Sequence, residues 1–186
     1  MRSCVAAVAD LAPLIVSATL GPADQRRFDA LRRAHFPPER NHLSAHLTLF
    51  HHLPPARADE LVRLLKQIAA DPAPVASVTE VYSLGRGVAY RVESPDLVAS
   101  RERVAEWFAS DLTAQDQAAP RLHITVQNKV DPAVAKALLA ELRADFQPHS
   151  LAITSLSVHY YRGGPWELIK EIPFRGAVRG GARSRY

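Results

Sequence analysis

The chain of 186 residues lacks the features that define several classes of protein. It has one cysteine, Cys4, which excludes a disulfide framework and a cysteine-rich zinc site. A reducing, cytoplasmic location is therefore the simplest expectation. No stretch approaches the roughly 20 apolar residues of a membrane span, so no membrane partner is expected. The apolar run at residues 4–9 is interrupted by Asp10 and Pro13, which argues against a secretory signal.

An excess of charge of one sign is also missing from most of the chain. The formal net charge is +4, from 23 basic and 19 acidic residues. The four arginines after residue 174 account for this whole excess, so the remainder is neutral. Residues 1–174 therefore lack the net positive charge on which non-specific nucleic-acid binding depends. The arginine-rich segment at residues 175–186 predicts either a segment that binds RNA or a solvated tail.

The rest of the composition is that of an ordinary globular protein. Hydrophobic residues make up 47% of the chain and charged residues 23%. The length suits one domain, or two small lobes that share a core. We expect an N-terminal extension over residues 1–12, a single two-lobed domain over residues 13–174 and a flexible Arg- and Gly-rich tail over residues 175–186. No expected helix has an uncommitted apolar face, so no obligate protein partner is expected.

Strand and helix patterns alternate along the chain. Runs of β-branched residues between Gly and Pro predict strands, and apolar residues three or four apart predict helices. Helical phase places Trp107 and Val134 on inward faces and Arg32 on an outward face. The expected strands cover residues 14–20, 46–51, 75–82, 88–92, 122–127, 151–160 and 166–172. The expected helices cover residues 23–34, 54–70, 95–110 and 132–145, with a polar linker at 115–120.

A repeat lies inside this alternation. Residues 46–49, His-Leu-Thr-Leu, recur 77 residues later as residues 123–126, His-Ile-Thr-Val. In both copies a proline follows the histidine by nine residues, and leucines follow it by fifteen and nineteen. Two copies of strand, loop and proline-started helix predict a duplicated, two-lobed α+β fold with a pseudo-twofold axis.

The residues of the repeat suit phosphodiester chemistry. Side chains two apart in a strand share a face, so each copy presents an imidazole and a hydroxyl together: His46 with Thr48, and His123 with Thr125. One neutral histidine can take a proton from an attacking hydroxyl, and the other, protonated, can give one to the leaving oxygen. The threonine hydroxyls can hydrogen-bond the non-bridging phosphoryl oxygens. This chemistry needs no metal and no cofactor, and it leaves open which histidine is the acid.

Strand alternation adds one further candidate residue after each motif. Phe50 falls on the face of His46 and Thr48, where it would stack on a base. Lys129 falls on the face of His123, where it would add positive charge near a phosphate.

A metal site is a weaker alternative. His42, His46, His51 and His52 are close in sequence, as metal ligands can be. His46 and His51 are separated by an odd number of residues, however, so a strand places them on opposite faces. No cysteine or carboxylate cluster accompanies them, and we expect no metal here.

The paired motifs, at this separation, resemble those of the 2H phosphoesterase superfamily, closest to its bacterial 2′-5′ RNA ligase and 2′,3′-cyclic phosphodiesterase group. The resemblance covers about residues 14–174. It implies a bilobal α+β fold in which two antiparallel sheets flank a central cleft. It also implies that His46 and His123 are catalytic, and that Thr48 and Thr125 bind the phosphate, in metal-independent opening of a cyclic phosphate or in the reverse ligation.

The resemblance does not fix the residues that close the cleft over the substrate. Arg86 and Tyr161 are the candidates for substrate binding, with Tyr160 and Arg162 beside Tyr161. None of them belongs to a motif.

We therefore expect a phosphoesterase that opens 2′,3′-cyclic phosphates on RNA ends or small nucleotides by two-histidine acid–base catalysis. Three alternatives stay open. The first is 2′-5′ RNA ligation, in which a ribose hydroxyl replaces water. The second is a module that binds RNA ends or a nucleotide without turning them over. The third is a small-molecule phosphodiesterase outside RNA metabolism, because the neutral body lacks a basic strip for a long strand.

Overall fold

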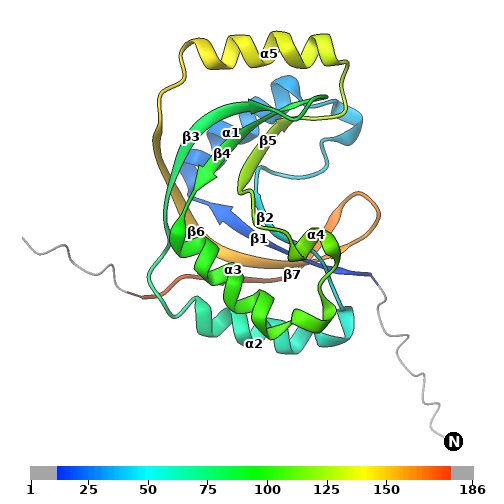
Figure 1. Cartoon of the computed structure of the whole chain (residues 1–186), viewed down its shortest axis with the longest axis vertical. Coiled ribbons are helices and arrows are strands. Elements are labelled where there is room, and N and C mark those ends of the chain that lie inside the picture. The colour runs from blue at the N-terminus through cyan, green and yellow to red at the C-terminus, as the bar shows by residue number, and fades with distance from the viewer. Residues whose placement is uncertain (1–11, 177–186) are drawn as a thin grey trace, which may run out of the picture.

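The computed structural model describes residues 12–176, and the strands of this part join in the order β2-β1-β6-β3-β4-β5, with β7 paired to β6 (Figure 1). All of the pairings are antiparallel. The strands are β1 (Leu14–Leu20), β2 (Leu47–Leu53), β3 (Val75–Ser83), β4 (Val88–Glu93), β5 (His123–Gln127), β6 (His149–Tyr161) and β7 (Trp166–Pro173). The α-helices are α1 (Pro22–His35), α2 (Ala58–Ile68), α3 (Pro95–Trp107), α4 (Ala114–Gln117) and α5 (Pro132–Ala144).

The long strand β6 joins two halves of the sheet. Its residues 149–152 pair with β3, and its residues 153–160 pair with β1. One half therefore contains β2, β1 and β7 together with most of β6, and the other contains β3, β4 and β5. The two halves curve away from each other, with α1 and α5 near one end of the molecule and α2 and α3 near the other (Figure 1). The expected α+β fold with antiparallel sheets is confirmed, and β6 makes the two sheets continuous.

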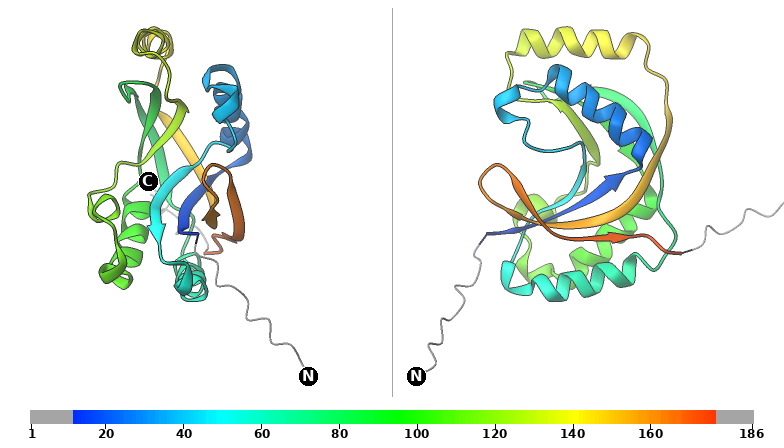
Figure 2. Two further views of the ribbon diagram at one scale, coloured as in Figure 1. Left: turned by 90° about the vertical axis from the view of Figure 1, so that its right-hand side faces the viewer. Right: turned by 180° about the vertical axis from the view of Figure 1, so that it is seen from behind.

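α1 and α4 each pack against the half of the sheet that does not contain their neighbouring strand in the chain. α1 follows β1 in the chain but packs against β5, and α4 precedes β5 but packs against β2. The strands β2 and β5, which carry the repeated motifs, also contact each other, and they lie side by side in Figure 2. The core between these elements is apolar and includes three fully buried aromatic rings, Phe28, Phe50 and Phe108. Each motif strand is thus held by elements from both halves.

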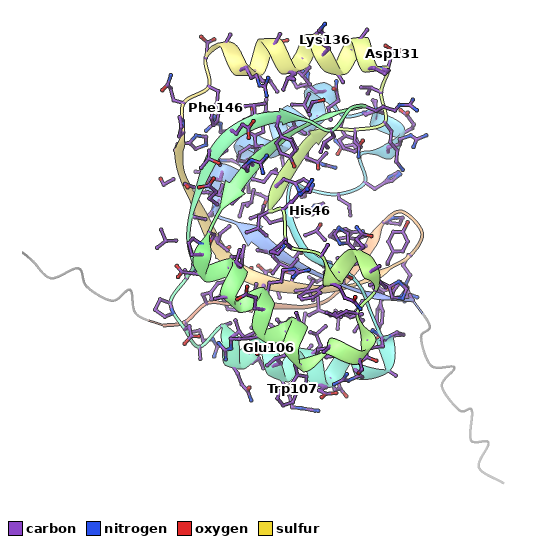
Figure 3. All side chains as sticks on the ribbon, viewed as in Figure 1. His46, Glu106, Trp107, Asp131, Lys136 and Phe146 are labelled. Carbon is purple, nitrogen blue, oxygen red and sulfur yellow. The ribbon has the colours of Figure 1, made fainter. Side chains whose placement is uncertain are left out.

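Two residues expected on inward helix faces are exposed. The side chain of Trp107 is 56% exposed and that of Val134 is 53% exposed. α3 ends at Trp107, which lies on the outer side of the molecule (Figure 3), while Phe108, also expected inward, is buried in the core. α5 buries Ala135 and Leu138 rather than Val134. The other apolar residues expected inward at helix ends, such as Leu61 and Ile68 of α2, are buried.

Phe50 is another correction, because it lies in the core and not in the cleft. Its side chain is 0% exposed. Thr48 pairs with Ser17 while Phe50 pairs with Val16, so a β-bulge interrupts the register between them. A bulge adds a residue to one strand and shifts the faces of the residues that follow. The expectation that Phe50 stacks on a base is therefore wrong.

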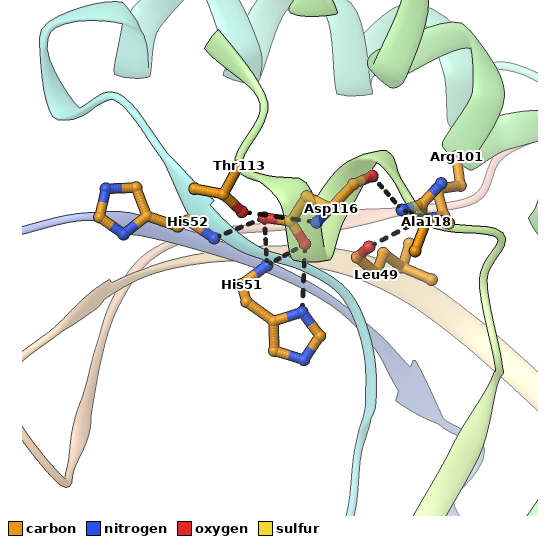
Figure 4. A network of polar contacts seen from close by, with 7 residues as sticks. All are labelled: Leu49, His51, His52, Arg101, Thr113, Asp116 and Ala118. Carbon is orange, nitrogen blue, oxygen red and sulfur yellow. Dashed lines mark hydrogen bonds and ion pairs between the residues drawn. The ribbon is translucent and has the colours of Figure 1, made fainter.

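Two buried polar side chains satisfy the backbone at this bulge (Figure 4). Arg101 of α3 donates through Nε to the carbonyl of Leu49 at 3.0 Å. Asp116 of α4 accepts from the backbone N–H groups of His51, at 3.0 and 3.1 Å, and of His52, at 2.9 Å. The segment at 115–120, expected to be a polar linker, thus contains a short helix and a carboxylate that is 1% exposed. Without these partners the bulge would leave buried backbone groups unpaired, which is costly.

The environment of Asp116 keeps it ionised. Burial alone would raise the pKa of its carboxyl, but the hydrogen bonds from His51 and His52 outweigh burial and hold this pKa below its ordinary value. The Arg101 guanidinium lies 4.8 Å from the centre of the Phe50 ring, so it also covers the bulged residue.

The outer parts of the chain are described only in part. The expected extension at 1–12 and tail at 175–186 lie outside the described residues except for Ala12, Arg175 and Gly176. The backbone N–H groups of Arg175 and Gly176 donate to the carbonyls of Ala69 and Asp71. Within residues 12–176, none of the helices combines the length and the hydropathy needed to cross a bilayer.

We expect Asp116→Asn to lower the free energy of unfolding by about 1–3 kcal/mol. The amide puts a donor where an oxygen accepted backbone N–H groups, and it removes the negative charge beside them. Urea denaturation measures the loss, with Asp145→Asn at the exposed end of α5 as the control. A loss equal to that of the control would show that the bulge does not depend on this carboxylate.

Candidate active site

The two motifs lie at corresponding places in the fold. His46 immediately precedes β2, and His123 is the first residue of β5. Both histidines, and the threonines two residues later, are half-buried. The alternating residues are buried on the other side, where Leu47, Ile124 and Val126 are 0% exposed and Leu49 is 4% exposed. The alternation expected within each motif is therefore present.

Both imidazoles are held in the same tautomer. Nδ1 of His46 lies 2.7 Å from the carbonyl oxygen of Ser44, and Nδ1 of His123 lies 2.6 Å from that of Arg121. A carbonyl oxygen can only accept a hydrogen bond, so Nδ1 carries the proton in each ring. In its neutral form each ring then has its lone pair on Nε2, and in its charged form Nε2 is a donor. Either histidine is thus prepared to act as base or as acid.

Arg32 of α1 links the two motif regions. Its Nε donates to the carbonyl of Leu43 at 3.1 Å, just before the first motif, and its Nη1 donates to the carbonyl of Thr125 at 2.8 Å, inside the second. The side chain is 5% exposed, and its guanidinium lies 4.3 Å from the centre of the Phe36 ring. The expectation that Arg32 faces outward is wrong, because these carbonyls give a buried guanidinium its partners. Phe28, one turn earlier, is buried on the same side of α1.

Two more side chains of α1 fix the backbone before His46. Asp29 accepts from the N–H of Ala45 at 2.6 Å, and Gln25 donates to the carbonyl of Ala45 at 2.9 Å. Gln25 also donates to Asp29 at 3.1 Å. The residue before His46 is therefore held through both of its backbone groups.

His46 lies near the centre of the molecule (Figure 3), and its surroundings favour the neutral ring. Burial lowers the pKa of His46 to about 4, against the opposing effect of the Ser44 carbonyl. The positive charge of Arg32 and the nearby imidazoles His159 and His123 lower this pKa further. His46 is consequently neutral at pH 7.

A pocket of about 300 Å³ opens beside His46. The indole of Trp166, at the start of β7, lies 4.5 Å from the imidazole of His46 and 5.3 Å from that of His159, measured between ring centres. Nε2 of His159 lies 3.2 Å from Oγ of Ser17, and burial lowers the pKa of His159. The pocket is lined by Ser17, Thr19, Gln25, His42, Leu43, Ser44, Ala45, His46, Ser157, His159, Trp166 and Leu168.

The surroundings of His123 are different. Tyr82 of β3 meets its ring edge-on, with 6.3 Å between ring centres. The guanidinium of Arg91 lies 4.8 Å from the centre of the Tyr82 ring and pairs with Glu80 at 2.8 Å. Arg121, two residues before His123, is exposed. His123 therefore faces a more charged surface than His46 does.

Arg86 lies in the turn between β3 and β4, and Lys129 follows the end of β5. β5 ends at Gln127 and Lys129 has a φ of 60°, so strand alternation does not extend to Lys129 as expected. Nε of Arg86 donates to the carbonyl of Val130 at 3.2 Å, and the N–H of Val130 donates to the carbonyl of Arg86 at 3.1 Å. The turn comes this close because Gly87 has no Cβ, which would lie 2.1 Å from the carbonyl oxygen of Gln127. Both cationic side chains are exposed, on the same half of the molecule as His123.

Tyr161 lies at the far end of β6. Its side chain is 42% exposed, and its N–H donates to the carbonyl of Pro13 at 3.0 Å. It shares a strand face with His159, two residues earlier, but it does not line the pocket beside His46. Sequence reasoning missed Arg32, His159 and Trp166, which belong to no motif. Their roles come from contacts between distant segments.

Comparisons with known proteins point to one family. The family model described as the 2′-5′ RNA ligase superfamily matches residues 20–165. No curated protein matches the chain by sequence.

Solved structures share the fold at low sequence identity. TT0787 of Thermus thermophilus has a TM-score of 0.59 and 14% identity, covering 88% of this chain and 98% of its own. LigT of E. coli in complex with 3′-AMP has a TM-score of 0.54 and 18% identity, with the same coverage. A structure described as a phosphoesterase has a TM-score of 0.55 and 17% identity, covering 89% of this chain and 99% of its own.

The lowered pKa of His46 predicts a pH dependence of stability. Between about pH 6.5 and pH 4 the unfolded chain binds a proton at this histidine and the folded chain does not, so the free energy of unfolding falls as the pH is lowered. The fall attributable to His46 is at most about 3 kcal/mol. Urea denaturation at several pH values measures it.

His46→Asn, which cannot titrate, should flatten this dependence. His52→Asn, at an exposed side chain in β2, is the matched control. An equal slope in wild type and His46→Asn would contradict the lowered pKa.

Proposed function

The chain belongs to the 2′-5′ RNA ligase superfamily of 2H phosphoesterases, and we propose that it opens 2′,3′-cyclic phosphates on RNA ends or small nucleotides with His46 and His123 as its two proton carriers. One observation above all supports this proposal. Two histidines, one just before β2 and one at the start of β5, each donate through Nδ1 to the carbonyl two residues earlier, so that each has Nε2 available for proton transfer.

The two histidines have different roles in the proposed reaction. His46 is the base, because its low pKa keeps it neutral and its Nε2 free to take a proton from water. His123 is the acid and gives its Nε2 proton to the ribose oxygen as the P–O bond breaks. After each turnover the two rings exchange protons with the solvent. No step in this scheme requires a metal ion.

Thr48 and Thr125 are proposed to hold the phosphoryl group. Each hydroxyl shares a strand face with its histidine and can donate to a non-bridging oxygen. Negative charge grows on these oxygens as the nucleophile attacks, so hydrogen bonds that follow it lower the barrier. The substrate phosphate would then lie between β2 and β5.

Two observations support a nucleotide substrate. LigT, which shares the fold, has been solved with 3′-AMP bound. In this chain the exposed cations Arg86, Arg121 and Lys129 are on the β5 side, where they would attract further phosphates of an RNA end. Tyr161 is proposed only as a residue at the rim. A cytoplasmic setting is proposed on the single cysteine.

A binding module without turnover is the remaining alternative from another class. It would need a phosphate site but not two imidazoles with matched tautomers, and for that reason we favour the enzyme.

His46→Ala and His123→Ala should each lower turnover of a nucleoside 2′,3′-cyclic phosphate by about 10²- to 10⁴-fold. Thr48→Val and Thr125→Val should each lower it by about a hundredfold. The assay resolves the 2′- and 3′-monophosphates by chromatography in the presence of EDTA, and a single isomer is expected. His52→Ala is the control. Near-wild-type turnover in either histidine variant, with the fold verified by circular dichroism, would refute the two-histidine mechanism.

The pH dependence of kcat/KM should show its acidic limb near pH 4. This parameter reports the ionisation of the free enzyme, and the proposed base becomes protonated with a pKa of about 4. Rates from pH 3.5 to 8, with folding checked at each pH, measure the limb. A limb near 6.5 would mean that another group, or an unperturbed histidine, is the base.

A further inference from the structure

We propose that His51, held by the buried carboxylate of Asp116, binds a second phosphate of the substrate, the one on the 5′ side of the nucleoside that carries the cyclic phosphate. This inference rests on the proposed function, because it uses the same cleft and the same reacting phosphate. It makes His51 a specificity-determining residue, which selects 5′-phosphorylated nucleotides and RNA ends over nucleosides that carry the cyclic phosphate alone.

The β-bulge of β2 places His51 on the cleft face of the sheet. Counting residues alone puts His51 and His46 on opposite faces. In the structure Thr48 pairs with Ser17, which lines the pocket beside His46. Phe50, beyond the bulge, is buried on the other face. The residue that follows Phe50 therefore returns to the face of Thr48.

The spacing along β2 matches that of neighbouring phosphates. Thr48 lies opposite Ser17 of β1, and the pairs that flank His51 place it opposite Ile15. Ser17 and Ile15 are two residues apart, which is about 7 Å at the rise of a strand. This is close to the distance between successive phosphates of a nucleic-acid strand. A substrate whose cyclic phosphate is held by Thr48 therefore brings its next phosphate to His51.

Asp116 fixes the orientation of the His51 ring (Figure 4). Nδ1 of His51 lies 3.1 Å from Oδ1 of Asp116, whose carboxylate is 1% exposed and ionised. A carboxylate oxygen accepts, so Nδ1 carries the proton and Nε2 is left for a ligand. The His51 side chain is 47% exposed, which gives a ligand access to it. His51 thus presents the same ring nitrogen as His46 and His123 do.

The charges beside His51 suit a bound anion. A protonated imidazole donates from Nε2 to a phosphate oxygen, and the Asp116 carboxylate balances its charge from the other side. Arg101 of α3 lies behind this pair and donates to the backbone carbonyl of Asp116 at 2.5 Å. The other titratable groups nearby are His52, the next residue of β2, and His159 of β6, which lies two strands away at the same level.

Two substrates that differ by one phosphate test the proposal. Rates are measured for adenosine 2′,3′-cyclic phosphate and for its 5′-phosphorylated form, and the readout is the ratio of the two kcat/KM values. We expect the wild type to prefer the 5′-phosphorylated substrate by about tenfold, and His51→Gln to lose this preference. The preference should also grow as the pH is lowered from 8 to 6, because an imidazole gains its charge in this range.

His52→Gln is the matched control, since Asp116 accepts from its backbone N–H and its ring points in another direction (Figure 4). It should keep the preference. His51→Lys, which puts a permanent cation at the same place, should keep a preference that no longer depends on pH. A purely structural role of His51 would give neither result.

The outcomes separate this inference from the proposed function. Equal kcat/KM values for the two substrates in the wild type would overturn the second phosphate site and leave the proposed function standing. An unchanged preference in His51→Gln would do the same for the assignment to His51. Failure to hydrolyse either substrate would instead reject the proposed function.

Binding of product analogues gives a readout that does not depend on turnover. Isothermal titration calorimetry compares adenosine 3′-monophosphate with adenosine 3′,5′-bisphosphate. The bisphosphate should bind about tenfold more tightly to the wild type and to His52→Gln, and no more tightly to His51→Gln. A preference that survives in His51→Gln but is lost when Arg86 and Lys129 are both replaced by Gln would put the second phosphate on the β5 side and contradict the proposal.

Discussion

Two buried guanidinium groups hold the motif strands together, and the site depends on them. Arg32 bonds the carbonyls of Leu43, before β2, and of Thr125, in β5. Arg101 bonds the carbonyl of Leu49, in β2, and that of Ala118, before β5, at 3.3 Å. A buried charge is tolerated only when its donors are satisfied, so each arginine requires backbone from both halves to stay in place. Losing either partner segment would leave a charge unpaired in the core.

The two motifs are arranged nearly symmetrically, and the different roles of the two histidines come from their different surroundings. Each half supplies an imidazole, a hydroxyl and a carbonyl that fixes the tautomer. The surroundings then separate the two rings. His46 is packed against Trp166 beside a neutral pocket, whereas His123 lies near Tyr82 and an exposed arginine. Duplication thus provides two equivalent groups, and burial keeps one of them in the neutral, proton-accepting form at pH 7.

Local pattern was enough to predict much of this architecture. The strand at 14–20 agrees with β1, and the hairpin at 75–92 and the faces of the His-x-Thr residues are also as expected, because alternation and turn residues act over a few positions. The bulge that buries Phe50 was not predictable, since it depends on Arg101 and Asp116. The burial of Arg32 was not predictable for the same reason, because its partner Thr125 is 93 residues away in sequence. Nothing in the neighbouring sequence identifies Trp166 as a residue of the pocket.

The most direct test of the whole account replaces the leaving oxygen of the cyclic phosphate by sulfur. A thiolate leaves without taking up a proton, so this substrate needs the base but not the acid. With it, the His123→Ala variant should regain most of the wild-type rate, and His46→Ala should stay inactive. Rescue of His46→Ala instead would reverse the roles of the two histidines. Rescue of neither variant would contradict acid–base catalysis by this pair.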